Sequence, residues 1–195
     1  MHNHHNRQAL RQQIRQARSA LSPEFQQQAS QLLVKQLQGI NAIACAKKVA
    51  IYLANDGELN TAEFIQWCWS QDIATYIPVL HPFSKGHLLF LHYQASTEMV
   101  INKYGISEPK LDIRQVCPPT SFDIIFTPLV AFDRTGARLG MGGGYYDRTL
   151  AKLTAPEPKI IGLAHDCQEL PAIPTENWDI PLKQIITPTT CYQFS

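Results

Sequence analysis

The chain lacks the features that mark membrane, secreted and zinc-binding proteins. No apolar run reaches the roughly 18 residues that a membrane-spanning helix needs, and no signal peptide opens the chain. Its five cysteines are odd in number and widely spaced, without a Cys-x-x-Cys pair, which argues against a disulfide framework and against a zinc site. These absences predict a soluble, cytoplasmic protein.

The chain also lacks an excess of charge of either sign. The formal net charge is +1, so no overall field favours nucleic acid or an anionic membrane as a partner. A length of 195 residues suffices for one well-buried domain and is short for two. We therefore expect a single domain over residues 1–195 that is a monomer and binds neither nucleic acid nor membranes.

Glycine, by contrast, is concentrated in one stretch, from Phe122 to Leu150. Two short apolar runs lead into four glycines within five positions, and Tyr145-Tyr146-Asp147-Arg148 then opens a predicted helix that continues to about Lys152. Backbone N–H groups can approach an anion closely only where no Cβ intervenes, and a helix start adds partial positive charge. The order strand, glycine loop, helix is therefore typical of a phosphate-binding loop.

The loop fits neither of the two familiar phosphate-binding patterns. No lysine follows the glycines, as the Walker pattern requires, and Tyr145 occupies the third glycine position of a Rossmann fingerprint. What is left is an anion loop with Arg134, Arg138 and Arg148 beside it and one carboxylate, Asp147. Arginine forks suit phosphate oxygens, tyrosines suit flat rings, and an aspartate near phosphates suits Mg²⁺. Composition alone leaves open a flexible surface loop that precedes a helix.

The rest of the sequence predicts alternating strands and helices. Ser22 and Pro23 form a good start for a helix that runs to about Gln38. The strand–helix–strand order that follows favours a three-layer α/β/α fold with a mainly parallel, Rossmann-like sheet. The predicted strands are Lys48–Leu53, Ala74–Val79, Leu88–Tyr93 and Lys159–Ala164; the helix between the first two is Thr61–Ser70, and a long polar excursion, Ser96–Thr120, contains a turn at Tyr104–Pro109.

A basic helix is predicted near the N-terminus, from about residue 5 to residue 20. On a helical wheel its arginines fall within one arc, and its apolar residues share a neighbouring face. The apolar face predicts docking against the domain. The basic face is compatible with a solvated surface, a nucleic-acid stripe or a ligand site, although no aromatic residue lies among the arginines for base stacking. The arginines are Arg7, Arg11, Arg15 and Arg18, and the apolar residues are Leu10, Ile14, Ala17 and Leu21.

The segment from Arg138 to Arg148, RLGMGGGYYDR, together with the preceding Ala131-Phe132-Asp133, resembles the signature of the 5-formyltetrahydrofolate cyclo-ligase family, also called 5,10-methenyltetrahydrofolate synthetase. The similarity extends over nearly the whole chain and is strongest from Asp123 to Leu150. It implies a sheet like those of sugar-phosphate isomerases and CoA-transferases. It also implies an ATP- and Mg²⁺-dependent ligase that closes 5-formyltetrahydrofolate to 5,10-methenyltetrahydrofolate, through a phosphorylated formyl oxygen, and releases ADP and phosphate.

The resemblance assigns roles to particular residues, and ATP and the folate are the implied partners. It implies that Arg138 and Arg148 are catalytic and that Asp147 and Asp179 bind metal. The implied ATP-binding residues are Arg7, Arg11, Arg138, Leu139, Gly140, Met141, Gly142, Gly143, Gly144, Tyr145 and Tyr146. The implied folate-binding residues are Leu53, Glu58, Met141, Gly142, Gly143, Gly144 and Tyr145.

The resemblance is incomplete at three positions. Arg7 stands where the family typically has a lysine, Met141 where it often has an aromatic or basic residue, and Lys183 where it commonly has an acid that would accompany Asp179. Arg7 keeps the charge of the lysine and changes the geometry of its donors. Two alternatives stay open on the same fold: a sugar-phosphate isomerase-like enzyme, and a nucleotide- or folate-binding module that does no chemistry.

Overall fold

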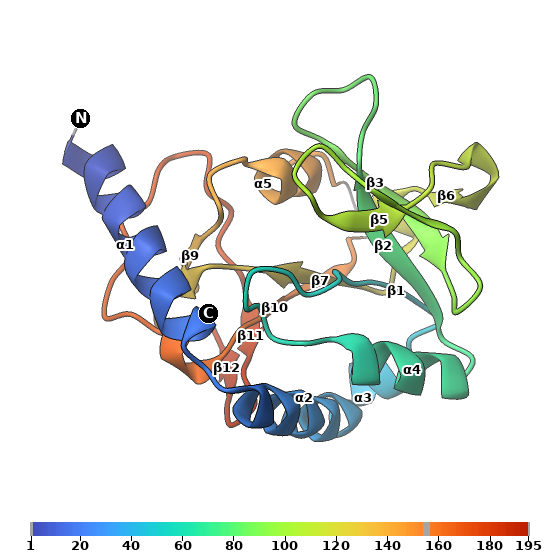
Figure 1. Cartoon of the computed structure of the whole chain (residues 1–195), viewed down its shortest axis with the longest axis horizontal. Coiled ribbons are helices and arrows are strands. Elements are labelled where there is room, and N and C mark those ends of the chain that lie inside the picture. Colours follow the sequence, from blue (N-terminus) through green and yellow to red (C-terminus); the bar gives the residue numbers. More distant parts are fainter. Residues whose placement is uncertain (1, 154–156, 195) are drawn as a thin grey trace.

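A single eight-stranded sheet runs through the computed structural model, which describes residues 2–153 and 157–194 (Figure 1). The strand order is β12-β11-β10-β7-β1-β2-β3-β6. The consecutive strands β11, β10, β7, β1 and β2 are parallel, whereas β12, β3 and β6 pair antiparallel to their neighbours. The bounds are β1 Lys48–Ala50, β2 Ala74–Leu80, β3 Leu88–Tyr93, β6 Val116–Cys117, β7 Ile124–Pro128, β10 Lys159–Leu163, β11 Gln184–Ile186 and β12 Cys191–Gln193.

Three helices cover one face of this sheet, and one short helix covers the other. Figure 1 shows α2 and α4 on the lower side and α5 on the upper side. The two sides of the core follow the alternation of side chains along each strand. In β7, Ile124 and Phe126 face the α2–α4 side, while Ile125 packs with Leu150 of α5. The helices on the two faces are α2 Pro23–Gln38, α3 Asn41–Ala44, α4 Ala62–Ser70 and α5 Tyr145–Leu150.

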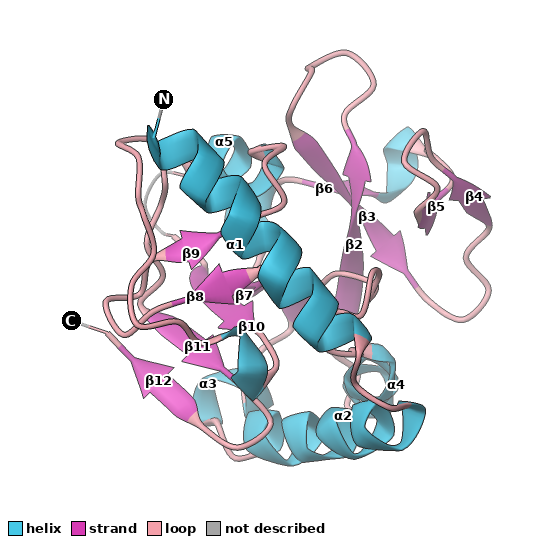
Figure 2. Ribbon diagram, turned by 60° about the vertical axis from the view of Figure 1, so that its left-hand side comes forward, coloured by secondary structure: helices cyan, strands magenta, loops and turns pink. Residues whose placement is uncertain are grey.

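The N-terminal helix, α1 (His2–Ser19), does not lie on either face of the sheet. Ile14 packs with Val130, Ala137 and Leu139, in and around a small antiparallel pair formed by β8 (Ala131–Phe132) and β9 (Arg138–Leu139). Figure 2 shows α1 crossing this part of the molecule. The apolar stripe that the sequence predicts therefore docks the helix against the segment that leads into the glycine loop.

The long excursion after β3 contains a hairpin that the sequence did not predict. Its strands are β4 (Met99–Ile101) and β5 (Ser107–Pro109), so the expected turn at 104–109 was wrong for its last three residues. The side-chain oxygen of Asn102 accepts hydrogen bonds from the backbone N–H groups of Tyr104 and Ile106, at 2.9 and 3.2 Å. This asparagine closes the turn early and lets the chain return as a strand.

Other predicted bounds are close to the observed ones. The helix predicted from Pro23 has the expected Ser22 cap, whose hydroxyl accepts from the N–H of Phe25 at 3.2 Å, and it ends at Gln38. The strand predicted to reach Leu53 ends at Ala50, although the N–H of Ile51 still donates to the carbonyl of Tyr76 in β2 at 2.9 Å. β12 was not predicted. Within the described residues, none of the helices combines the length and the apolar character needed to cross a lipid bilayer.

Gly136, in the turn between β8 and β9, has no room for a side chain. Its φ is +82°, and a Cβ there would collide with the carbonyl oxygen of Leu182. The residue also accepts a hydrogen bond from the N–H of Leu182 at 2.9 Å, so it joins the turn to the C-terminal segment.

We predict that Gly136→Ala lowers the free energy of unfolding by about 2 kcal/mol or more, because both the positive φ and the backbone contact oppose a Cβ. Gly105→Ala is the matched control, since Gly105 has φ +74° and a methyl group added there would meet no atom within 4 Å. Gly105→Ala should lower the free energy of unfolding by about 1 kcal/mol. Urea denaturation of both variants measures the difference, and equal losses would contradict the role of the Leu182 contact.

Candidate active site

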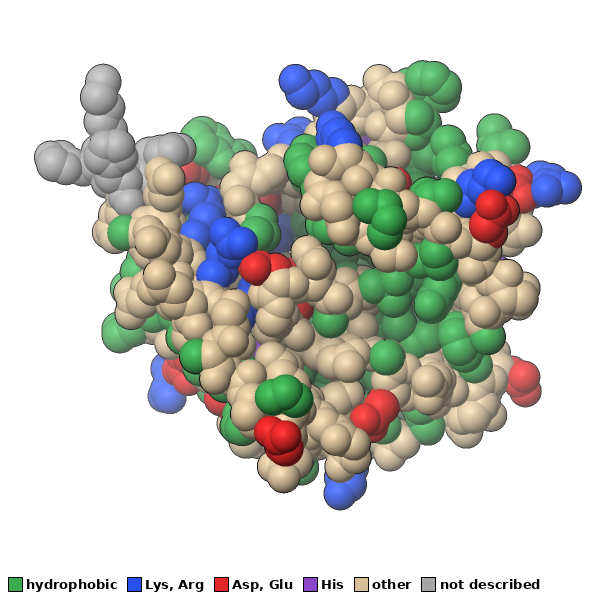
Figure 3. Space-filling model, in the orientation of Figure 1, with side chains coloured by type: hydrophobic (Ala, Val, Ile, Leu, Met, Phe, Trp, Pro, Cys, Tyr) green, Lys and Arg blue, Asp and Glu red, His purple; other side chains and the backbone are tan. Residues whose placement is uncertain are grey.

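A cavity of about 650 Å³ opens at the carboxyl ends of the parallel strands, where α/β sheets commonly bind ligands. Three segments form its walls: the loop after β1, the β4–β5 hairpin and the glycine loop before α5. Figure 3 shows basic side chains gathered along α1 at one side of the hollow. Of the predicted residues, those that line the cavity are Leu53, Glu58, Arg138, Gly140, Met141, Gly143, Gly144, Tyr145, Tyr146 and Asp147.

The glycine loop takes backbone conformations that other residues rarely adopt. Gly142 has φ +96° and Gly144, which precedes the first residue of α5, has φ +62°. A Cβ on Gly143 would lie 2.8 Å from the ring of Tyr145, so the ring lies directly against the bare backbone. Leu139, in contrast, has its side chain in the core, and only its backbone can serve a ligand.

Arg138 forms a buried ion pair at the base of the glycine loop. Its Nη2 lies 2.5 Å from Oδ1 of Asp147, and its Nε donates to the carbonyl of Ile180 at 3.2 Å. Only 4% of Arg138 is exposed. Burial lowers the pKa of the Arg138 guanidinium, and the carboxylate of Asp147 opposes this effect. The group keeps its proton at neutral pH because arginine starts from a very high pKa.

Arg7 and Arg11 hold neighbouring backbone from behind the cavity. Arg7 pairs through both Nη atoms with the carboxylate of Asp179 and donates to the carbonyl of Pro174 at 3.1 Å. Burial works against the charge of Asp179, yet the bonds from Arg7 and from the N–H of Glu176 hold its pKa below its usual range. Arg11 donates through Nε to the carbonyl of Gly140 at 2.7 Å. Arg11 therefore contacts the glycine loop and Arg7 contacts the C-terminal segment, and neither lines the cavity.

Arg148 joins the glycine loop to the turn between β2 and β3. Its Nε donates to the carbonyl of Gly86 at 3.0 Å, and its Nη2 donates to the carbonyl of Gly143. Gly86 leaves space for this contact, since a Cβ there would collide with the guanidinium of Arg148. In this arrangement the guanidinium acts as a bridge between two loops, and the catalytic role of Arg148 stays a prediction.

The opposite wall of the cavity is apolar around one carboxylate. Glu58 follows β1, and Tyr52, Leu53 and Tyr146 line the cavity with it. Burial raises the pKa of Glu58 to about 7, although Arg18 lowers it in part. The buried hydroxyl of Tyr146 makes no hydrogen bond within the part of the chain that the structure describes. A carboxylate on an otherwise apolar wall is therefore available to a ligand that carries N–H donors.

The β4–β5 hairpin supplies residues that sequence reasoning missed. The hydroxyl of Tyr104 lies 2.8 Å from the hydroxyl of Tyr145 and so connects the hairpin to the glycine loop. Glu108 accepts from the N–H of Leu80 at 3.3 Å and from the amide of Asn102 at 2.9 Å, which holds the hairpin over β2. The signal in the sequence was the long polar excursion, which predicts a segment that closes over ligands.

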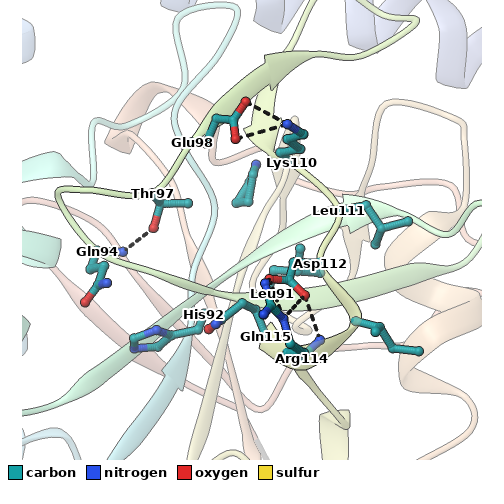
Figure 4. A pocket seen from close by; sticks show the side chains of 12 residues that line it. Leu91, His92, Gln94, Thr97, Glu98, Lys110, Leu111, Asp112, Arg114 and Gln115 are labelled. Carbon is teal, nitrogen blue, oxygen red and sulfur yellow. Dashed lines mark hydrogen bonds and ion pairs between the residues drawn. The ribbon is translucent and has the colours of Figure 1, made fainter.

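A second cavity, of about 600 Å³, lies on the other side of the hairpin (Figure 4). Its charged side chains pair with one another: Lys110 lies 2.9 Å from Glu98, and Arg114 lies 2.8 Å from Asp112. These pairs are largely exposed and form across short distances in the sequence. The charged groups that line this cavity are thus already paired, and we place the candidate site in the first cavity.

One carboxylate in the cavity is suited to a magnesium ion. Mg²⁺ is commonly held by one or two carboxylates together with phosphates of the substrate. Asp147 lines the cavity beside the glycine loop, whereas Asp179 lies behind it as the partner of Arg7. Among the residues described, no three His, Cys, Asp or Glu side chains form a group that could hold a metal by themselves. The site therefore fits an ion that arrives with phosphate.

Comparison with known proteins agrees with this geometry. The model of the 5-formyltetrahydrofolate cyclo-ligase family matches residues 3–188. The chain belongs to the 5-formyltetrahydrofolate cyclo-ligase family. The cyclo-ligase of Escherichia coli K12 is 46% identical over 181 residues, which are 93% of this chain and 100% of that protein. The cyclo-ligase of Haemophilus influenzae is 46% identical over 184 residues, covering 94% of this chain and 98% of the relative.

Solved structures of the cyclo-ligase family share the fold. The 5,10-methenyltetrahydrofolate synthetase of Aquifex aeolicus has a TM-score of 0.82 at 26% identity and covers 96% of this chain and 92% of its own. The synthetase of Mycoplasma pneumoniae has a TM-score of 0.73 at 28% identity, with 93% of this chain and 98% of its own covered. The mainly parallel α/β sheet predicted from the sequence is thus confirmed.

Proposed function

We propose that the chain catalyses the ATP-dependent closure of 5-formyltetrahydrofolate to 5,10-methenyltetrahydrofolate, with release of ADP and phosphate. Family membership supports this activity. The observation that carries it is the cavity itself, in which a glycine loop with a buried arginine faces a wall formed by Leu53 and Glu58. The lining residues come from one chain, so we propose that a monomer is sufficient.

The reaction requires alignment more than reactive side chains. Direct loss of the formyl oxygen would need water or hydroxide to leave an amide-like carbon, which is slow. Transfer of the γ-phosphoryl group to that oxygen makes it a good leaving group; the neighbouring nitrogen of the folate then attacks the carbon, and phosphate departs. Both nucleophiles belong to the substrate. The protein therefore contributes position and charge neutralisation, which dominate enzymatic phosphoryl transfer.

The glycine loop and its arginines are suited to hold the triphosphate. The backbone N–H groups of Gly140, Gly142, Gly143 and Gly144 can approach phosphate oxygens because no Cβ intervenes. Arg138 is fixed by Asp147 at the base of the loop, so its charge is already oriented when ATP binds. Arg11 uses Nε on the loop carbonyl, which leaves its Nη atoms for phosphate. Tyr145 supplies a flat surface at the rim.

Asp147 is the residue that we expect to hold Mg²⁺ together with the phosphates. When bound, the ion would neutralise phosphate charge and restrict the geometry of the transferring group. Oδ1 of Asp147 already accepts from Arg138 and, at 3.3 Å, from the N–H of Ile180. These bonds orient the carboxylate toward a ligand. Asp179 stabilises Arg7 in the present arrangement, and its role as a metal ligand stays a prediction.

The wall around Glu58 is suited to the reduced pterin. A pterin presents an amino group and ring N–H donors, and a carboxylate is the acceptor that matches them. Oε2 of Glu58 accepts from the N–H of Asn55 at 3.1 Å, which fixes the carboxylate and leaves Oε1 for the folate. The side chains of Tyr146 and Leu53 complete the apolar part of this pocket.

One assay separates the proposed activity from its two alternatives. The protein is mixed with ATP, Mg²⁺ and 5-formyltetrahydrofolate, and both ADP and the absorbance of the conjugated methenyl product are followed. We expect the two products in equal amounts. Absence of ATP consumption would favour a sugar-phosphate isomerase-like enzyme, and binding of either ligand without product would favour a binding module.

Asp147→Asn should raise the Mg²⁺ concentration that gives half-maximal activity by about 10-fold or more, because the variant keeps the shape of the carboxylate and loses its charge. A Mg²⁺ titration at saturating ATP and folate measures this. Asp112→Asn is the control, since Asp112 is ion-paired with Arg114 outside the cavity. An unaltered titration for Asp147→Asn would reject the metal assignment.

The affinity for 5-formyltetrahydrofolate should fall as the pH decreases through about 7. Burial raises the pKa of Glu58 to about 7, so the acceptor carboxylate predominates above this pH and its protonated form below it. If only the ionised form binds, affinity drops about 10-fold between pH 8 and pH 6. Binding is measured without ATP by calorimetry. Glu58→Gln should remove the pH dependence, and persistence of the same profile in that variant would assign it to another group.

A further inference from the structure

Arg18, near the end of α1, is completely buried although it carries a charge. Its exposed fraction is 0%. Nε donates to the carbonyl of Asp56 at 2.7 Å, Nη2 donates to Oδ2 of the same residue at 2.8 Å, and Nη1 donates to the carbonyl of Leu129 at 3.4 Å. A buried guanidinium needs such acceptors, because a buried charge without partners is strongly destabilising. Two of the three bonds go to one residue of the loop after β1.

Asp56 lies in a turn with an unusual backbone conformation. Asp56 has φ +52° and Gly57 has φ +72°, so two consecutive residues are in the left-handed region. Non-glycine residues seldom adopt it and keep it only where their surroundings hold them there. A Cβ on Gly57 would lie 3.3 Å from both Cγ and the carbonyl oxygen of Arg18. The turn therefore lies directly on the arginine that binds it.

The same turn sets the direction of Glu58. The N–H of Glu58 donates to the carbonyl of Asn55 at 3.0 Å, and its carboxylate accepts from the N–H of Asn55 at 3.1 Å. These two bonds close the turn around Asp56 and Gly57. Any rotation of the peptide units at Asp56 and Gly57 would therefore move the carboxylate of Glu58 relative to the cavity.

Arg15 offers a natural comparison on the same helix. It also binds Asp56, through Nε to Oδ2 at 2.7 Å and through Nη2 to Oδ1 at 3.1 Å. Its side chain is 45% exposed, whereas that of Arg18 is 0% exposed. Exposed ion pairs contribute little, since water and salt screen them. Arg15 lines the cavity and bonds to the carboxylate of Asp56, while Arg18 bonds to the backbone of Asp56 as well.

We infer that Arg18 is a positioning residue: by binding the carbonyl and the carboxylate of Asp56, it fixes the left-handed turn that aims Glu58 at the folate. The inference rests on the proposed function, because Glu58 acts on the folate only there. Arg18 does not touch the ligand. It acts through Asp56 and Glu58, so its removal should affect the folate and leave the nucleotide site unchanged.

The test measures binding of 5-formyltetrahydrofolate and of ATP separately, by calorimetry, in Arg18→Lys. Lysine keeps the charge and cannot form the fork to Asp56. We expect the dissociation constant for the folate to rise about 10-fold or more, which corresponds to a lost charge-assisted hydrogen bond, and that for ATP to stay within about 2-fold. Arg114→Gln, which breaks an exposed ion pair outside the cavity of the candidate site, should change either constant by less than about 3-fold.

Two further variants separate positioning from general stability. In a Glu58→Gln background, Arg18→Lys should no longer weaken folate binding. The effects of two substitutions on the binding free energy do not add when one residue acts through the other. Asp56→Ala removes the carboxylate and does not relieve the strain of the left-handed backbone, so it should reproduce the folate-specific loss. This variant also carries the test if Arg18→Lys does not fold.

The outcomes distinguish the inference from the proposed function. Equal losses for folate and ATP in Arg18→Lys, additive effects with Glu58→Gln, or normal folate binding by Asp56→Ala would each overturn the positioning role while the wild-type protein still makes product. A wild-type protein that binds no folate would overturn the proposed function, and the inference with it.

Discussion

The structure depends on guanidinium groups that bind backbone carbonyls and carboxylates at one end of a sheet. Four arginines lie along one arc of α1 and bind other parts of the chain. Arg7 binds Asp179 and Pro174, and Arg11 binds Gly140. Arg15 binds the carboxylate of Asp56, while Arg18 binds both the carboxylate and the carbonyl of Asp56 and also the carbonyl of Leu129. Because a helix is stiff, it holds these loops in a fixed relation. The apolar stripe around Ile14 attaches the helix to the core.

This arrangement explains why the cavity needs no reactive side chain. Phosphoryl transfer to an oxygen of the substrate requires that two ligands meet in one orientation and that developing charge is neutralised. The glycine loop, which we propose holds the nucleotide, is anchored to α1 through Arg11. The turn beside Glu58, which we propose holds the folate, is anchored to the same helix through Arg18. Arg138, buried with Asp147, places a cation at the base of the loop before any ligand binds. Because these charged groups are oriented before the reaction, they need not reorient as charge develops in the transition state.

Local signals were sufficient to predict much of the fold. The Ser22–Pro23 start gave the observed bounds of α2, and apolar alternation located β2 and β3 closely. The antiparallel direction of β3 was not predictable, because it depends on pairing with β2 and β6. The hairpin β4–β5 was missed because each of its strands has only three residues, which is too short for an apolar alternation to show; contacts of Glu108 and Asn102 hold it in place.

In the candidate site, the sequence predicted the residue types, whereas the contacts between distant residues came from the structure. The glycine loop, Asp147 and the neighbouring arginines form one short stretch, and their residue types indicate a phosphate site without structural knowledge. The pairs that fix those groups join distant residues: Arg7 and Asp179 are 172 positions apart, and Tyr104 and Tyr145 are 41 apart. No local pattern contains such contacts. The resemblance to a family placed Glu58 near the folate, but only the structure connects it to Arg18.

The turn beside Glu58 contains a strained residue. Asp56 has φ +52°, a conformation that glycine adopts freely and other residues seldom do. In a residue with a side chain, such a conformation persists only where other contacts enforce it. At Asp56 the enforcing contact is a buried arginine, whose desolvation must itself be offset by hydrogen bonds. A fold selected for stability alone gains nothing from pairing a strained turn with a buried charge. A fold that must hold one carboxylate in a fixed direction gains from this pairing, because the hydrogen bonds that compensate the buried charge of Arg18 also fix the backbone conformation of the turn.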